Sequence, residues 1–149
     1  MGKTDWNRTA TYEDANLILR LYEERREDKL REARAWFVAE CKPKLLTEWQ
    51  ALCPPGSTMN AYYRMVTSYW EMATSFVAGG VLHPELFIQN SLEHLIVWER
   101  IEAFVPELRK MNNSPHHLRN LETVAELSKE WLDRQGDGVY ESFAGRFKA

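Results

Sequence analysis

The residues best suited to metal binding or proton transfer in this sequence are its four histidines, His83, His94, His116 and His117. A di-iron site in a helical bundle needs carboxylates from several helices together with Glu-x-x-His, because residues three apart share a helix face. No glutamate stands three positions before any of the four histidines, and the zinc motif His-Glu-x-x-His is also absent. The sequence therefore predicts no metal site and no other cofactor.

Nucleophilic chemistry has no recognisable motif either. Cys41 and Cys53 lie twelve positions apart and form neither a Cys-x-x-Cys pair nor a zinc spacing. The sequence has no Gly-x-Ser-x-Gly motif and no phosphate-binding glycine loop. The pattern favours two small apolar thiols near helix faces. We assign no catalytic residue and lean toward a protein that is not an enzyme, although a triad assembled from distant residues would leave no motif.

Four residues in apolar helical segments are candidates for lining an interhelical pocket: Tyr69, Glu71, His94 and Trp98. Glu71 is either paired with Arg64, seven residues earlier on the same face, or a pocket carboxylate with a raised pKa. His94 lies within an apolar arc, which favours a core histidine bonded to a carbonyl or a carboxylate. Trp98 lies in the most apolar segment and is expected in the core.

Helices must position these residues, because apolar side chains recur at helical spacing and no segment alternates as a strand does. The pattern predicts an all-α, single-domain helical bundle of about five main helices over residues 1–149. The first would be a long N-terminal helix of about thirty residues, preceded by a flexible N-terminus over 1–10. The expected helices cover residues 11–41, 44–52, 57–78, 84–111 and 114–134, with a short helix or turn after 138.

Clusters of proline, glycine and asparagine predict corners at 53–57, 79–83, 112–114 and 135–138. In "GGVLHP", one of the two glycines supplies the left-handed residue that commonly ends a helix. Proline is favoured at the first position of the next helix, so His83 is interpreted as its flanking residue. A histidine in this frame needs a second ligand or base at a fixed spacing to form a site, and none is visible nearby.

The stretch "EERREDK", residues 23–29, is charged all round and lies in the middle of the expected long helix. Its apolar positions lapse for two turns, whereas a coiled coil needs them sustained over several heptads. A solvated face is the favoured interpretation. A surface for a protein partner, or for a second copy of the chain, is the alternative.

Composition narrows the class of protein further. The 149 residues include 19 basic and 22 acidic side chains, for a net charge of −3. A nucleic-acid binder usually carries a basic domain or stripe, so nucleic acid is not an expected partner. No run approaches the roughly 18 apolar residues of a membrane span. We expect a soluble, cytoplasmic protein.

One region resembles a known family. "YWEMATSFVAGGVLHPELF" followed by "WERIEAFVPELR", within residues 69–109, is similar to a group of bacterial all-helical proteins classed only as domains of unknown function. The shared elements are an aromatic and acidic helix end, a glycine corner, and a tryptophan-bearing helix that closes on proline. Because that group has no assigned activity, the resemblance implies a helical fold and no functional residue.

Two functional hypotheses follow. The favoured one is a non-enzymatic helical interaction or accessory module that uses the long N-terminal helix to bind a protein partner or to form a homo-oligomer. The alternative is a small-molecule-binding or catalytic bundle with an interhelical pocket near Tyr69, Glu71, His94 and Trp98. A cavity that holds both Glu71 and His94 would favour the alternative.

Overall fold

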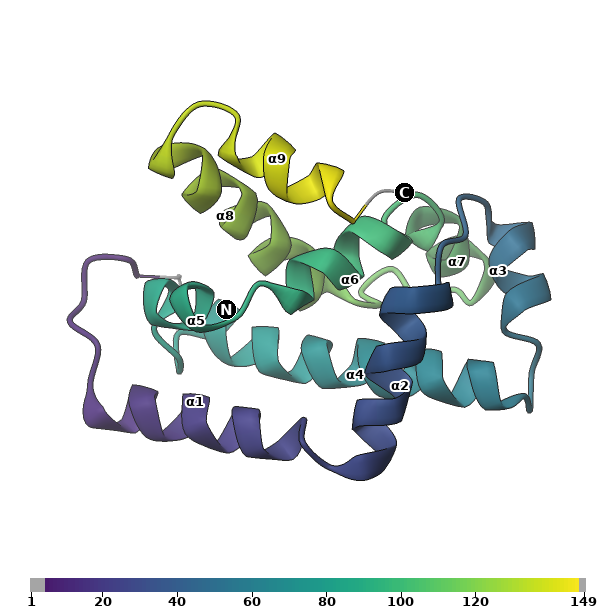
Figure 1. Cartoon of the computed structure of the whole chain (residues 1–149), viewed down its shortest axis with the longest axis horizontal. Helices are drawn as coiled ribbons and strands as arrows, with labels where there is room; N and C mark the ends of the chain where they lie inside the picture. Colours follow the sequence, from purple (N-terminus) through teal and green to yellow (C-terminus); the bar gives the residue numbers. More distant parts are fainter. Residues whose placement is uncertain (1–4, 148–149) are drawn as a thin grey trace.

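The computed structural model describes residues 5–147 and shows an entirely helical chain over that range, with no strand (Figure 1). The all-α prediction is confirmed. Within these residues the chain forms nine helices, so the predicted count of about five was wrong. The helices are α1 Tyr12–Glu24, α2 Asp28–Glu40, α3 Leu46–Leu52, α4 Thr58–Ala78, α5 Pro84–Asn90, α6 Glu93–Ile101, α7 Val105–Met111, α8 Arg119–Gln135 and α9 Val139–Gly145.

The predicted long N-terminal helix is two helices, and the charged stretch at 23–29 is where it breaks. Glu27 accepts hydrogen bonds from the backbone N–H groups of Lys29 and Leu30, which caps a new helix. An acidic residue that could have continued α1 therefore starts α2 instead. Figure 1 shows α2 turning steeply away from α1 and crossing α4.

The region expected as one helix over 84–111 is divided into α5, α6 and α7. Asn90 ends α5, and Ser91 adopts an extended backbone. α7 begins at Val105 with Pro106 in its first turn, where proline's missing N–H costs least. Phe104 precedes α7 and is fully buried, so packing of this aromatic side chain fixes the second break.

α4 is the longest helix and the one around which the others gather. α2, α6 and α8 pack against it, while α9 packs on α8. The core between these helices includes Trp98, as expected, and many side chains with almost no exposed surface. The largest of these are Trp70, Phe37, Phe104, Leu82, Ile88, Leu95, Ile101 and Leu121.

The glycine corner after α4 has the predicted geometry. Gly79 is the C-cap with an ordinary helical φ, and Gly80 holds the left-handed position at φ +81°. The N–H groups of Val81 and Leu82 both donate to the carbonyl of Phe76, which satisfies the end of the helix. His83 is then the N-cap of α5, as its place before Pro84 indicated.

Two further expectations concern the ends of the chain and membranes. The flexible segment over 1–10 stays a prediction, and residues 1–4 lie outside the described range. Within this segment, Arg8 makes the contacts given below. No helix within residues 5–147 has both the length and the apolar character needed to cross a membrane.

Gly80→Ala is expected to lower the free energy of unfolding by about 1–2 kcal/mol, because a side chain at positive φ is strained. Gly145→Ala is the matched control: this glycine lies in α9 with open space around its Cβ position, so little change is expected. Urea denaturation followed by circular dichroism measures both. Equal effects at the two positions would contradict the assignment of Gly80 to the left-handed position.

Candidate functional site

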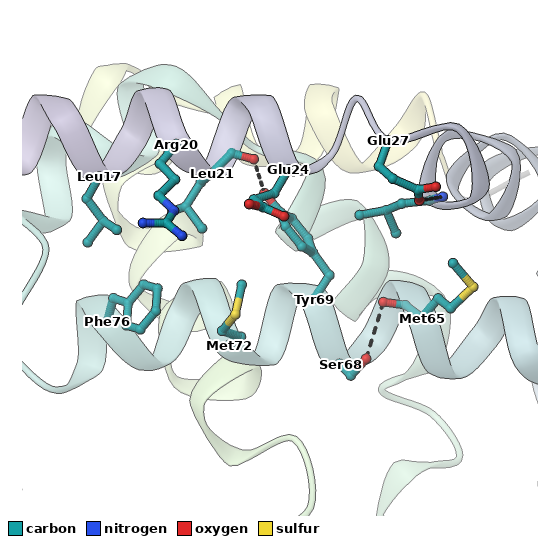
Figure 2. A pocket seen from close by; sticks show the side chains of 11 residues that line it. Leu17, Arg20, Leu21, Glu24, Glu27, Met65, Ser68, Tyr69, Met72 and Phe76 are labelled. Carbon is teal, nitrogen blue, oxygen red and sulfur yellow. Dashed lines mark hydrogen bonds between the residues drawn. The ribbon is translucent and has the colours of Figure 1, made fainter.

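A groove of about 770 Å³ lies between α1 and α4. Figure 2 shows the two helices running alongside each other, with side chains from both pointing into the space between them. We call this the α1–α4 groove. It is lined by Leu17, Arg20, Leu21, Glu24, Glu27, Leu30, Met65, Ser68, Tyr69, Met72 and Phe76.

The wall contributed by α4 is an apolar stripe. Met65, Tyr69, Met72 and Phe76 follow one another at steps of four, three and four residues, which places them on one helix face. Met72 keeps 41% of its surface exposed although it lies in the middle of the longest helix. Met65 and Phe76 are half-buried and Tyr69 is buried, so this face of α4 is only partly covered.

The wall contributed by α1 is mixed. Leu17 and Leu21 face the groove, and Arg20 and Glu24 lie between and beyond them (Figure 2). Across residues 5–147, neither Arg20 nor Glu24 forms an ion pair closer than 4 Å. The hydroxyl of Tyr69 donates to the carbonyl of Leu21, which joins α4 to α1 across the groove.

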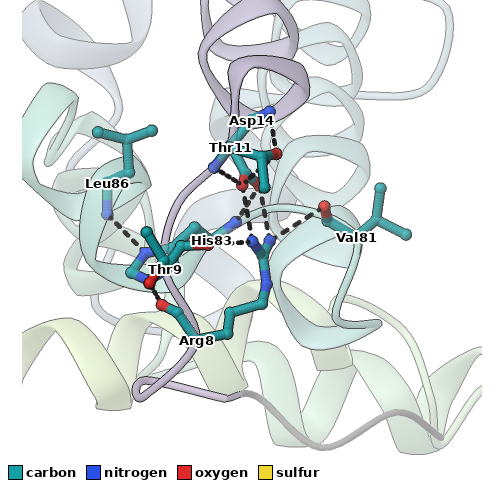
Figure 3. A network of polar contacts seen from close by, with 7 residues as sticks. All are labelled: Arg8, Thr9, Thr11, Asp14, Val81, His83 and Leu86. Atoms are coloured by element: carbon teal, nitrogen blue, oxygen red, sulfur yellow. Dashed lines mark hydrogen bonds and ion pairs between the residues drawn. The ribbon is translucent and has the colours of Figure 1, made fainter.

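A polar cluster at the other end of α1 fixes this helix to the corner before α5 (Figure 3). Arg8 forms two hydrogen bonds with the carboxylate of Asp14, at 2.6 and 2.7 Å. The backbone N–H groups of Thr11 and His83 donate to the same carboxylate, at 2.7 and 2.8 Å. We call this group the Arg8–Asp14–His83 cluster. It joins the segment before α1, the first turn of α1 and the α4–α5 corner.

Asp14 is almost completely buried, with 2% of its surface exposed. The paired Arg8 guanidinium, together with the two backbone donors, holds the pKa of this carboxyl well below its usual range despite the opposing effect of burial. Asp14 is therefore ionised at neutral pH. Its charge is satisfied by groups from segments that are far apart in the sequence.

His83 takes part in the cluster through its ring as well as its backbone. The backbone N–H of Leu86 donates to Nδ1 at 3.2 Å, which is the N-cap interaction of α5. Nε2 lies 2.7 Å from the carbonyl oxygen of Arg8. A carbonyl only accepts, so Nε2 carries the proton. The interpretation of His83 as a helix-flanking residue is right, but its link to Arg8 was not visible in the sequence.

Glu71 does not pair with Arg64, whose guanidinium donates instead to Asn60 on the same helix. The Glu71 carboxylate accepts from the backbone N–H of Asn120 at 2.8 Å and of Leu121 at 3.2 Å. These two groups belong to the first turn of α8, whose own N-cap supplies no side-chain acceptor. Glu71 thus caps a different helix from its own, and its partial burial raises its pKa.

α8 begins later than the sequence predicted, and this difference explains why Glu71 caps it. The helix was expected to begin at residue 114, but it begins at Arg119. Leu118, just before it, has a left-handed backbone with φ 58° and is buried. The side chain of a leucine cannot accept a hydrogen bond from the N–H groups of the first turn. The missing acceptor comes from α4.

His94 is fully buried beside Trp70 and Phe87. Its Nε2 lies 2.8 Å from the hydroxyl of Ser128, which itself donates to the Val124 carbonyl. Because the hydroxyl proton of Ser128 is donated to the Val124 carbonyl, Nε2 of His94 must carry a proton and donate it to the Ser128 oxygen. Nδ1 has no partner within the described part of the chain. Burial lowers the pKa of His94 to about 3, so the ring is neutral near pH 7.

The structure does not bring the four candidates from the sequence together around one pocket. Tyr69 lines the α1–α4 groove, Glu71 caps α8, and His94 and Trp98 lie in the core. Sequence reasoning missed Arg20 and the α1 side of the groove, because the pattern indicated one continuous helix and did not place it beside α4. The available signal was the breadth of the apolar surface on α4, which exceeds what one covered face requires.

Metal ligation has no candidate within residues 5–147, where no three or more His, Cys, Asp or Glu side chains are placed to hold an ion. The absence of a cofactor stays a prediction.

Asp14→Asn is expected to lower the melting temperature at pH 7. Ionised Asp14 stabilises the fold above its unfolded-state pKa of about 3.9, and this contribution is lost as the pH falls. The difference from the unchanged protein should therefore shrink between pH 5 and pH 3. Thermal melts at several pH values test this, with the exposed Asp137→Asn as control. A difference that does not vary with pH would count against the cluster.

Glu71→Ala is expected to lower the free energy of unfolding by about 1 kcal/mol, because two N–H groups of α8 lose their acceptor. Glu71→Gln keeps one acceptor oxygen and should cost less. Glu126→Ala on α8 removes only a surface pair with Lys129 and should change stability by less than about 0.5 kcal/mol. Urea denaturation compares the three variants, and a neutral Glu71→Ala would refute the capping role.

Comparison with known proteins agrees with the resemblance found within residues 69–109. The model of a family described as "Domain of unknown function (DUF4760)" matches residues 10–131, which include α1 to α7 and most of α8. No curated protein and no solved structure matches the chain. The match covers the α1–α4 groove, the Arg8–Asp14–His83 cluster apart from Arg8 itself, and the Glu71 cap. The chain belongs to the DUF4760 family of domains of unknown function.

Proposed function

We propose that this protein is a non-enzymatic interaction module, and that its α1–α4 groove binds an amphipathic helix of a partner protein. The observation that carries the proposal is the partly uncovered apolar stripe on α4, with Met72 exposed, opposite Leu17 and Leu21 of α1. Monomeric proteins rarely expose a large contiguous apolar patch, and such a patch rimmed by polar residues is typical of a binding surface.

The dimensions of the groove suit a helix. Met65 and Phe76 are eleven residues apart on α4, which corresponds to about 16 Å along the helix axis. A partner helix of three to four turns, lying alongside, would cover this length. Such a helix would present apolar side chains at i, i+3, i+4 and i+7. Met65 and Met72 are flexible and polarisable, so they can adapt to the partner's side chains.

The charges at the edge indicate how the partner would lie. Arg20 and Glu24 are one turn apart on α1, and neither is neutralised by another described residue. A helix with an acidic residue opposite Arg20 and a basic residue opposite Glu24 would satisfy both, and the reverse orientation would place like charges together. These charges therefore favour one direction of binding.

The alternative, a small-molecule or catalytic site near Tyr69, Glu71, His94 and Trp98, has less support. Its residues are separated between the groove, the start of α8 and the core, as described above. The carboxylate of Glu71 is occupied by two backbone donors. The Nε2 atom of His94 is occupied by Ser128.

The expected compartment is the cytoplasm. Cys41 and Cys53 are free thiols and both are buried, which supports a reducing environment. Burial raises the pKa of Cys41 to about 12 and that of Cys53 to about 11, so neither is suited to act as a nucleophile.

Met72→Glu tests the groove, and Met59→Glu is its matched control, because both methionines lie on α4 with 41% of their surface exposed and only Met72 lines the groove. The probe is a fluorescent sixteen-residue amphipathic peptide with leucines at i, i+3, i+4 and i+7. A glutamate and a lysine, one turn apart, stand at the edge of its apolar face. A scrambled peptide of the same composition is the second control.

Saturable binding by fluorescence anisotropy is expected for the amphipathic peptide and not for the scrambled one. Met72→Glu should weaken it about tenfold or more, because the partner would bury an unpaired charge, and Met59→Glu should change it less than twofold. Equal effects of the two substitutions would overturn the proposal. So would sedimentation data showing that the groove is closed by a second copy, with a dimer that Met72→Glu dissociates.

A further inference from the structure

A second hollow, of about 260 Å³, lies where α1 ends and α2 begins. It is lined by Tyr22, Arg25, Arg26, Arg31 and Arg34, and we call it the arginine pocket. It shares no residue with the α1–α4 groove. Its inference is independent of the function proposed above.

The fold separates charges that are mixed in the sequence. Between residues 22 and 34 the acids Glu23, Glu24, Glu27, Asp28 and Glu32 alternate with the arginines, yet none of these acids lines the pocket. Glu24 and Glu27 line the α1–α4 groove instead. The break between α1 and α2 thus directs guanidinium groups to one place and carboxylates to another.

Three of the four arginines lack a counter-charge. Arg34 donates to Glu93 at 2.8 Å and is neutralised. Arg25, Arg26 and Arg31 form no ion pair closer than 4 Å within residues 5–147. Like charges that converge on one hollow repel each other, and an anion placed between them removes that repulsion.

Several of these groups are held in place before any ligand arrives. The Arg25 guanidinium lies 5.1 Å from the ring centroid of Tyr22 and 5.4 Å from that of buried Trp70. Arg34 donates to the backbone carbonyl of Arg25 at 2.9 Å, which ties the two helices together. Arg26 lies 5.8 Å from the Tyr22 ring. Cation–π contacts and hydrogen bonds therefore pre-organise part of the pocket.

We propose that the arginine pocket binds a phosphate group carried by a phosphate monoester. A monoester dianion offers two negative charges and three terminal oxygens, whereas a carboxylate offers one charge and two oxygens. Guanidinium forks match phosphate geometry through paired N–H donors. Three uncompensated arginines around one small hollow therefore suit phosphate better than a carboxylate.

The neighbouring surface indicates where the ester group would lie. A hollow of about 430 Å³ is lined by Arg31, Arg34, Ala35, Val38, Ala39 and Glu93. It shares Arg31 and Arg34 with the arginine pocket, so the two hollows adjoin along α2. Ala35, Val38 and Ala39 give this extension an apolar surface. The organic part of the ligand is therefore expected to be compact and partly apolar.

Isothermal titration with phenyl phosphate, at constant ionic strength, tests the proposal against benzoate as the matched carboxylate. The test variant is Arg26→Gln with Arg31→Gln, because both side chains are exposed and form no hydrogen bond in the described structure. The control is Arg134→Gln with Arg146→Gln, which removes two positive charges from exposed side chains outside both hollows. Circular dichroism confirms that both double variants remain helical.

Saturable binding of phenyl phosphate is expected, with benzoate at least about tenfold weaker. The Arg26/Arg31 variant should lose about tenfold or more in affinity, while the Arg134/Arg146 variant stays within twofold. Equal losses in both variants would show general charge attraction and overturn the proposal. Failure to bind phenyl phosphate, together with failure to bind phosphatidylcholine vesicles that contain phosphatidic acid, would overturn it as well.

The two probes also distinguish the sources of the phosphate. Binding of phenyl phosphate that depends on Arg26 and Arg31 supports a soluble ester. Vesicle binding that is lost in the same variant, without binding of phenyl phosphate, supports the same phosphate chemistry on a lipid headgroup. Vesicle binding retained in the variant would contradict a site in this pocket.

Discussion

The structure depends on a single constraint, which is that α4 is apolar around most of its circumference. A helix of 21 residues with this character must be covered on several sides at once. α2, α6 and α8 supply that cover over the faces that carry Val66, Trp70, Ala73 and Val77, all nearly inaccessible to solvent. The remaining stripe faces α1, which lies beside it without closing the space. At the groove, the other helices of the chain leave part of the apolar surface of α4 uncovered.

α1 is attached by polar interactions near both of its ends and by packing against α5. Its first turn is tied to the α4–α5 corner through buried Asp14, and its last turn receives the hydroxyl of Tyr69 at the carbonyl of Leu21. Between these two points, Ile18 packs against the core on the side of α5, Leu17 and Leu21 line the groove, and Leu19 is exposed. Directional hydrogen bonds can hold a helix at a distance that close side-chain packing would not tolerate. This explains how an open groove persists next to a dense core.

Local chemistry in the sequence was sufficient for much of the fold, because the signals at the corners act over a few residues. Gly80 and Pro84 specified the α4–α5 corner and the role of His83. The same reasoning failed at Glu27, because a charged residue compatible with a continuous helix was used as a cap. It also failed at the start of α8, where the acceptor is Glu71, 49 positions from Asn120. Contacts across such separations leave no periodic pattern, so neither the groove nor the cap could be predicted from spacing.

The cap on α8 has a consequence for the order in which the chain acquires structure. The first turn of α8 has no acceptor of its own, and its N–H groups are satisfied by a carboxylate from α4. This turn is therefore stable only once α4 has formed and docked beside it. The helix can nucleate in its middle, where no such acceptor is needed, but its N-terminal boundary is set by assembly. Tertiary contacts thus determine where α8 begins, whereas local helix propensity favours its interior.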